Sequence, residues 1–233
     1  MDEPSVAVLI DAENASPANA AAILDEAAKY GRVAIRRMYG NWTTPQLGGW
    51  KRTLNELGIR PIQQFHFTTG KNATDSALII DAMDLMHTGK ADVFCLVSSD
   101  ADFTLLASRL REDGIRVVGM GEKKTPKAFV RACDHFAYVE NLADPAQAEE
   151  AHGSTDAGAL DLLQRAYDKA EGPDGVAYLA RIGELLTRLE PAFDTRTYGH
   201  SKLIDLVADF PAKFEIDIAE GTRNTHVVRR VDG

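Results

Sequence analysis

Val6-Ala-Val-Leu-Ile-Asp-Ala-Glu-Asn14 lies near the start of the chain and combines five consecutive apolar residues with an aspartate directly after them. An apolar run of this length, rich in Val, predicts a strand of a parallel α/β sheet. Asp11 then falls at the carboxyl end of that strand, where open parallel sheets collect their functional residues.

The following 130 residues or so repeat this pattern, with apolar runs alternating with amphipathic segments. Further strands are predicted at Val33–Gly40, Arg60–Phe67, Asp92–Ser98 and Arg116–Met120. Helices are predicted at Ala18–Tyr30, Pro45–Leu57, Asp75–His87, Phe103–Asp113 and Pro126–Asp134. Ser16 before Pro17 is typical of a helix start, and glycines follow the first four helices. Alternating strands and helices predict a parallel α/β sheet flanked by helices, a pattern that closes near Leu142.

Residues 143–156 have little apolar content and predict a linker. Beyond them, apolar residues at helical spacing predict helices around Leu163 and Leu185 and a third helix over Lys202–Ala208. Two strand-like segments follow at Phe214–Ala219 and Thr225–Val231. We therefore expect an α/β domain over residues 1–142, a linker over 143–156 and a small winged-helix domain over 157–233.

The 233-residue chain carries a net charge of −9, from 35 acidic and 26 basic residues. This balance argues against a nucleic-acid module that binds by bulk charge, but it leaves room for a local basic groove. The apolar runs are too short to predict a membrane helix, and we see no secretion leader. Cys95 and Cys133 lie in apolar settings outside any CxxC pair, which favours a reducing, cytoplasmic location.

Three more carboxylates are expected at the same edge of the sheet as Asp11. Asp100 follows the fourth predicted strand, Asp102 comes two residues later, and Asp75 opens the third helix. If strands one and four are neighbours, Asp11 and Asp100 face each other. Clustered carboxylates repel unless a cation neutralises them, and oxygen ligands suit Mg²⁺ or Mn²⁺. The alternative for Asp75, Asp100 and Asp102 is ordinary helix capping.

Polar, basic and aromatic residues near this edge are candidate contacts for a nucleic acid, as a phosphate-binding rim with a platform on which unpaired bases stack. These candidates are Asn14, Trp42, Lys71, Ser99, Lys123, Lys124 and Lys127. For Asn14 and Ser99 the alternative is to orient a carboxylate, and for the others it is a solvated face or ordinary packing. Another basic cluster lies near the second strand, and a solvated surface is its stronger explanation. Its residues are Lys29, Arg32, Arg36 and Arg37.

Other chemistries find weak support. The six histidines show no HxxxH or HxH spacing, no serine lies in a GxSxG motif, and no GxGxxG follows the first strand. Asp100-Ala-Asp-Phe-Thr104 matches the DxDx[TV] string of haloacid-dehalogenase-type phosphatases. That family carries the string on its first strand, whereas here it follows the fourth.

Three motifs in order resemble the NYN domain, the LabA-like branch of the PIN-like nuclease superfamily. They are Val-Leu-Ile-Asp-Ala-Glu-Asn14, Lys-Asn-Ala-Thr-Asp-Ser-Ala-Leu78 and Val-Ser-Ser-Asp-Ala-Asp-Phe103. The resemblance covers residues 5–142 and implies a Rossmannoid sheet in which Asp11, Asp75, Asp100 and Asp102 bind Mg²⁺ or Mn²⁺ for RNA cleavage, with Asn14 nearby. Asn72 stands where the family usually has glycine.

The segment from Gly158 to Val231 resembles an OST-HTH (LOTUS) domain, which implies an RNA or protein partner. Residues 155–233 hold 10 basic and 14 acidic residues, so a phosphate-binding surface is not evident. The best candidates for contacting a partner are Arg196, Tyr198, His200 and Lys202. The alternative is that these residues cap and solvate the third helix. We predict a metal-dependent endoribonuclease acting on single-stranded RNA. The alternative is a non-catalytic RNA-binding or regulatory adaptor that keeps an acidic pocket.

Overall fold

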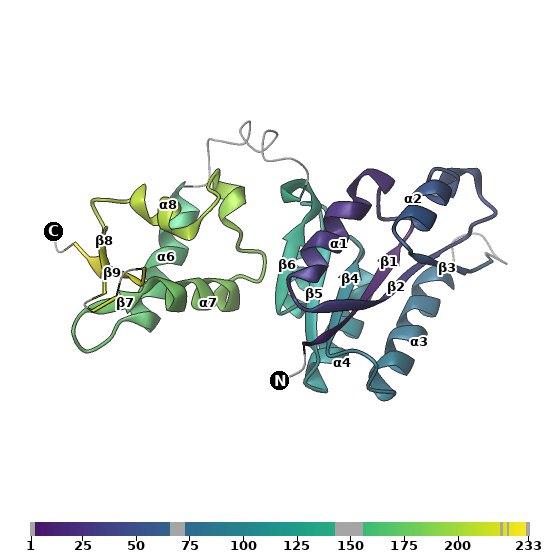
Figure 1. Cartoon of the computed structure of the whole chain (residues 1–233), viewed down its shortest axis with the longest axis horizontal. Helices are drawn as coiled ribbons and strands as arrows, with labels where there is room; N and C mark the ends of the chain where they lie inside the picture. The colour runs from purple at the N-terminus through teal and green to yellow at the C-terminus, as the bar shows by residue number, and fades with distance from the viewer. Residues whose placement is uncertain (1–2, 66–72, 143–155, 220, 223, 232–233) are drawn as a thin grey trace. The chain divides into compact units, whose positions relative to one another are not determined.

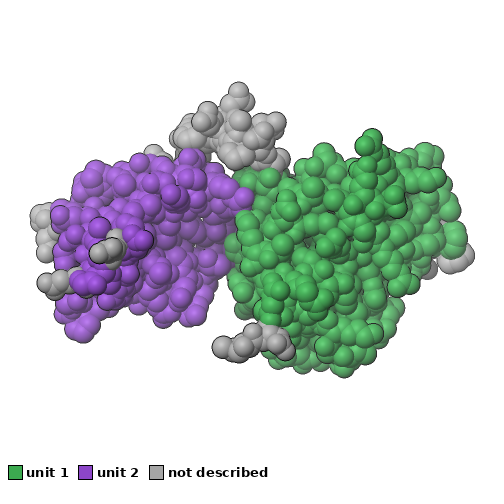
Figure 2. Space-filling view, in the orientation of Figure 1, with its two compact units in different colours: residues 1–143 green, residues 144–233 purple. Residues whose placement is uncertain are grey.

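The computed structural model describes residues 3–65, 73–142, 156–219, 221–222 and 224–231. The chain divides into two compact units, Met1–Ala143 and Asp144–Gly233, which are coloured separately in Figure 2. Each unit has a hydrophobic core of its own. The predicted linker at 143–156 falls almost wholly outside the described residues, and so does Lys71.

Unit 1 is built on a six-stranded sheet in which every pairing is parallel. Its strands are β1 (Ser5–Asp11), β2 (Arg32–Gly40), β3 (Arg60–Gln63), β4 (Val93–Val97), β5 (Arg116–Gly121) and β6 (His135–Tyr138). Their order across the sheet is β3-β2-β1-β4-β5-β6. The chain therefore reverses its direction of winding between β1 and β4, and the carboxyl ends of such neighbours are where open sheets bind their ligands. The predicted parallel α/β fold is confirmed.

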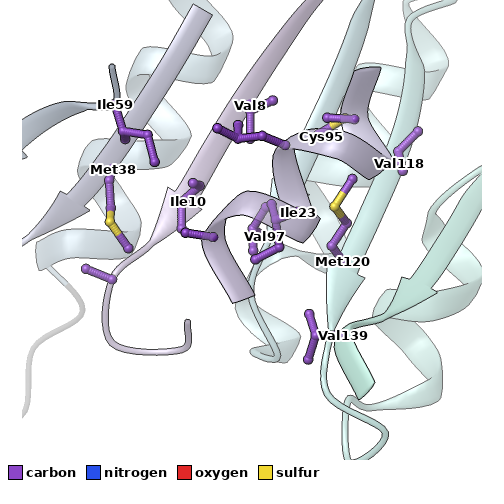
Figure 3. Close-up of a cluster of buried hydrophobic side chains, with 14 of the residues drawn as sticks. Val8, Ile10, Ile23, Met38, Ile59, Cys95, Val97, Val118, Met120 and Val139 are labelled. Atoms are coloured by element: carbon purple, nitrogen blue, oxygen red, sulfur yellow. The ribbon is translucent and has the colours of Figure 1, made fainter. Parts of the chain in front are cut away.

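Helices cover both faces of this sheet (Figure 1). They are α1 (Ala20–Ala28), α2 (Trp50–Glu56), α3 (Ala73–His87), α4 (Thr104–Glu112) and α5 (Lys127–Ala132). On the face of α1 and α2, alternate strand residues such as Val8, Ile10 and Val97 pack with Ile23 (Figure 3). Each such side chain contributes about 1.5–3 kcal/mol on full burial, which holds the strand ends in fixed positions.

The structure corrects several predicted boundaries. The sixth strand, β6, was not predicted, because its four residues follow α5 with no apolar run long enough to stand out. The helix predicted over Pro45–Leu57 is interrupted at Gly48-Gly49, which separate a 3₁₀ turn from α2. Glycine is a weak helix former, and two in succession favour a break. The predicted strand Arg60–Phe67 pairs only as far as Gln63 within the described residues.

Unit 2 packs three helices against a small antiparallel sheet. The helices are α6 (Asp156–Ala170), α7 (Leu179–Leu189) and α8 (Leu203–Ala208), and the strands are β7 (Val176–Tyr178), β8 (Phe214–Ile218) and β9 (His226–Arg230). The strand order β7-β9-β8 places the C-terminal hairpin beside a third strand, as a winged helix requires. β7 was not predicted, since three residues carry no readable periodicity. Among the described helices, none combines the length and hydropathy that crossing a bilayer demands.

Candidate metal centre

Asp11 is a buried carboxylate held by three donors at the carboxyl end of β1. It is 2% exposed. Its Oδ1 accepts a hydrogen bond from the Glu13 backbone N–H (3.0 Å), and its Oδ2 accepts from Asn14 Nδ2 (2.7 Å) and Ser98 Oγ (3.0 Å). Buried polar groups in native structures are satisfied in this way. The donors fix the direction of the carboxylate, and Asn14 is one of the residues that orient it.

Ser98 links the carboxyl ends of β1 and β4. Besides donating to Asp11, its hydroxyl accepts a hydrogen bond from the Asp100 backbone N–H at 3.1 Å. It is 1% exposed. The sequence reasoning passed over this residue, although it stands two positions before Asp100 directly after a buried strand. The pairing of β1 with β4, which the sequence left as a condition, is what brings the Ser98 hydroxyl to Asp11.

Asp100 serves as a helix cap as well as a candidate ligand. Its Oδ1 accepts from the Asp102 backbone N–H at 2.9 Å and begins the 3₁₀ turn Ala101–Phe103. The capping explanation is therefore true for Asp100. A cap occupies one carboxylate oxygen and does not by itself explain why other carboxylates gather around it.

Asp75, Asp100 and Asp102 come together at this edge. One carboxylate oxygen from each residue lies within 4.8 Å of the others. Asp75 stands in the first turn of α3, and the other two stand at the 3₁₀ turn just before α4, so two segments far apart in the sequence converge. Asp11 is not in this tight group, but its charge reaches Asp75.

The electrostatics of Asp75 show how crowded the group is. Burial, and after it the negative charges of Asp11, Asp100, Asp102 and Glu13, raises the pKa of Asp75 to about 6. A carboxyl whose charged form is disfavoured in this way gains most from a nearby cation. The donor set is oxygen only, which suits Mg²⁺ or Mn²⁺ rather than zinc. The residues present therefore fit a hard divalent ion.

Two residues predicted to contact RNA are used inside the protein. Ser99 is 8% exposed, and its hydroxyl accepts from the Glu122 backbone N–H at 2.9 Å. This bond ties the loop after β5 to the end of β4. Trp42 packs partly buried against the hydrophobic core, and its indole N–H donates to the Ile62 carbonyl at 3.0 Å. Only the exposed part of this side chain remains for stacking a base.

The three lysines after β5 are exposed, as a phosphate-binding rim requires. Lys123, Lys124 and Lys127 lie on the loop into α5 and in its first turn. Lys124 forms an ion pair with Glu122 at 2.6 Å, which reduces its free charge. Gly121, at the start of this loop, is approached so closely that a Cβ there would lie 2.5 Å from the Ser98 carbonyl oxygen. The loop and the β4 end therefore form one tightly packed platform.

The contact candidates of unit 2 are largely engaged within it. Arg196 forms an ion pair with Asp194 at 2.6 Å, and His200 Nε2 lies 2.7 Å from a carboxylate oxygen of Asp209. Tyr198 packs its ring against that of Phe193. Lys202, which is exposed just before α8, is the candidate that remains.

Comparison with known proteins agrees with this architecture. The sequence profile of the NYN domain matches residues 5–140, and that of the OST-HTH/LOTUS domain matches residues 155–224. The crystal structure of a protein of unknown function from Vibrio parahaemolyticus is similar with a TM-score of 0.50 at 18% identity, over 60% of this chain and 95% of that chain. At this identity the likeness concerns the fold alone. No curated protein matches the chain significantly.

Proposed function

The chain belongs to the NYN domain family, and we propose that it is a metal-dependent endoribonuclease whose OST-HTH/LOTUS domain selects or positions the RNA. The family is PIN-like and nuclease-related, so a nucleic-acid function is its general expectation. The observation that carries the specific proposal is the convergence of Asp75, Asp100 and Asp102 within 4.8 Å.

In this proposal Asp75, Asp100 and Asp102 hold Mg²⁺ or Mn²⁺. A bound ion of this kind supplies charge for the phosphodiester and activates water. Asp11 contributes its negative charge to the metal site from a fixed position, because Glu13, Asn14 and Ser98 donate hydrogen bonds to its carboxylate. Asp102 serves either as a direct ligand or by orienting the ligand group.

Proton occupancy at Asp75 sets the pH range of such a site. Below a pH of about 6 this carboxyl carries a proton in the metal-free protein, so a cation must displace that proton to bind. We expect metal affinity and cleavage to weaken as the pH falls through 6. The exposed Lys123 and Lys127 would contact the RNA phosphates. We further infer a cytoplasmic protein, since Cys95 and Cys133 are both free and buried.

Cleavage of labelled RNA tests the proposal. Pure protein is incubated with single-stranded and structured RNA in Mn²⁺ or Mg²⁺, beside Asp100→Asn and an EDTA control. Asparagine caps a helix as well as aspartate does, so the variant keeps the cap and loses the charge. Metal-dependent cleavage that disappears in Asp100→Asn supports the proposal.

The adaptor is the second candidate, and the internal bonds of the acidic residues favour it. Asp100 caps a 3₁₀ turn and Asp11 accepts three hydrogen bonds, so both have structural uses without a metal. An adaptor predicts that RNA is bound equally by wild type and Asp100→Asn and is cut by neither. Absence of both binding and cleavage would instead indicate that unit 2 docks a protein.

A further inference from the structure

The first half of β2 forms an open edge of the sheet. β3 pairs with β2 only from Arg37 to Gly40, so residues 32–36 have no strand partner on that side among the described residues. On the other side, the register with β1 passes from Val33 to Ile35, which leaves Ala34 as a bulged residue. Unpaired backbone N–H groups at such an edge are available donors.

Two cavities of about 430 and 420 Å³ lie beside this edge and share Val33 and Arg36. The first also contains Glu3 and Asp25, which disfavour an anion. The second, which we call the edge pocket, is lined by residues 33–37, Gly58 and Arg60. Its charged residues are all arginines, so it is suited to a negatively charged group.

The arginines of the edge pocket differ in how far they are neutralised. Arg37 forms an ion pair with Asp81. Arg36 and Arg60 form no ion pair with a carboxylate in the described part of the chain. The Nη1 of Arg36 donates to the Leu57 carbonyl at 2.9 Å, which fixes the guanidinium. In a chain of net charge −9, two guanidinium groups without a carboxylate partner beside an open backbone edge form a local concentration of positive charge.

The strand register relates the edge pocket to the acidic group. Arg36 pairs with Val8, three residues before Asp11, which corresponds to about 10 Å along the strand. Side chains alternate along a strand, so Arg36 lies on the face of Val8 and Met38, and Asp11 lies on the other face with Arg37 and Tyr39. Arg60 pairs with Arg37 one strand further out, which places it about 12 Å from Asp11 by strand geometry. A stacked strand advances about 3.4 Å per nucleotide, so these separations correspond to about three to four nucleotides.

We propose that the edge pocket binds backbone phosphates of the substrate RNA, about three to four nucleotides from the bond at the acidic group. Arg36 and Arg60 would neutralise the phosphates, and the open N–H groups of β2 would donate to their oxygens. This inference rests on the proposed function, since it takes RNA as the ligand. It assigns a role to part of the basic cluster near the second strand.

A binding assay without catalysis tests the pocket. A 12-nucleotide single-stranded RNA is titrated at several salt concentrations into Asp100→Asn protein in EDTA. The test protein adds Arg36→Gln and Arg60→Gln. The control adds Arg52→Gln and Arg109→Gln, which remove the same charge from exposed helix ion pairs. Thermal melting confirms that each protein is folded.

Each lost phosphate contact lowers the salt slope of log K for a single strand by about 0.7, so the double variant loses about 1.4. At 0.1 M salt this corresponds to affinity weaker by up to about 25-fold. The control pair should bind within about twofold of its parent. The charge-keeping pair Arg36→Lys and Arg60→Lys should recover most of the affinity. If the double variant does not fold, Arg60→Gln alone should show a loss of about fivefold.

Equal binding by test and control proteins would overturn the edge pocket, and metal-dependent cleavage by wild type would then leave the nuclease proposal standing. No RNA binding by any of the proteins would overturn the edge pocket, and wild type that also fails to cut RNA in Mn²⁺ would overturn the nuclease proposal. A trinucleotide is too short to span from the acidic group to the pocket, so its affinity should not distinguish test from control. If inorganic phosphate at low millimolar concentration displaces the RNA, the ligand of the edge pocket would be an isolated phosphate and not an RNA strand.

Discussion

Replacing Asp75 by Asn should stabilise the metal-free protein at neutral pH, which is opposite to the usual effect of losing a residue at a helix start. The pKa of Asp75 is raised from 3.8 to about 6. For a group shielded from water, this difference corresponds to a destabilisation of the folded state by about 3 kcal/mol when the carboxyl is charged. Asp75 is partly exposed and screened by water, so we expect about 1 kcal/mol. If Asp75 served only the helix start, its loss would instead cost about 0.3–1 kcal/mol.

The pH dependence follows from the direction of this pKa. The folded state holds the Asp75 proton more tightly than the unfolded chain does. The free energy of unfolding therefore falls as the pH rises from 3.8 to about 6, and the whole penalty is present above that range. Asp75→Asn should gain stability over wild type at pH 7.5 and gain none at pH 3.5.

Thermal unfolding in EDTA at the two pH values measures this difference. About 1 kcal/mol corresponds to a rise of about 2–4 °C in the Tm of a domain of this size. Asp84→Asn, on the exposed face of the same helix, is the matched control and should change stability by less than about 0.5 kcal/mol.

Addition of Mn²⁺ should reverse the order of stabilities. The free energy of unfolding of wild type should rise by about 2.7 kcal/mol at a metal concentration 100 times the Kd, and that of Asp75→Asn should rise much less. A destabilised Asp75→Asn protein at pH 7.5 in EDTA would refute the crowding argument and leave Asp75 as a helix-start residue.

Three further substitutions test the surroundings of the acidic group. Ser98→Ala removes one of three donors to the buried Asp11 carboxylate and should lower the free energy of unfolding by about 2 kcal/mol while weakening Mn²⁺ binding, as denaturant melts and calorimetry would show. Trp42→Phe loses the hydrogen bond to the Ile62 carbonyl and should lower the free energy of unfolding by about 1 kcal/mol. It should change RNA affinity by less than twofold, whereas a tenfold loss would show that Trp42 stacks on a base. Gly121→Ala places a Cβ 2.5 Å from a carbonyl oxygen and should cost about 1–3 kcal/mol in a thermal melt, whereas an unchanged Tm would show that the loop yields easily.

The alternation of apolar runs and helical segments was enough to predict the α/β fold, because Val6–Ile10 and Val93–Val97 are buried strands with no other explanation. Ordering these strands needed more than periodicity. That β1 lies beside β4 was stated as a condition, and the sheet order confirms it. The short strands β6 and β7 were not predicted, because three or four residues are too few to show a periodic pattern of hydrophobicity.

Side-chain roles were harder to predict than backbone positions. The sequence places Asp100 at a strand end, but it does not reveal that Ser98 joins it to Asp11 across two strands. Ser99 and Trp42 are polar or amphipathic residues that follow strand ends, and their hydrogen bonds to Glu122 and Ile62 are long-range contacts that only the packed structure shows. Grouping of the carboxylates themselves followed from topology, which is why that part of the site could be anticipated.

The most direct test of the metal centre is anomalous diffraction from crystals soaked in Mn²⁺. We predict a peak bounded by the carboxylates of Asp75, Asp100 and Asp102, with Asp11 nearby, and no peak in Asp100→Asn crystals treated alike. Saturating Mn²⁺ without a peak at this position in wild type would contradict the account and leave the carboxylates as caps and turn residues.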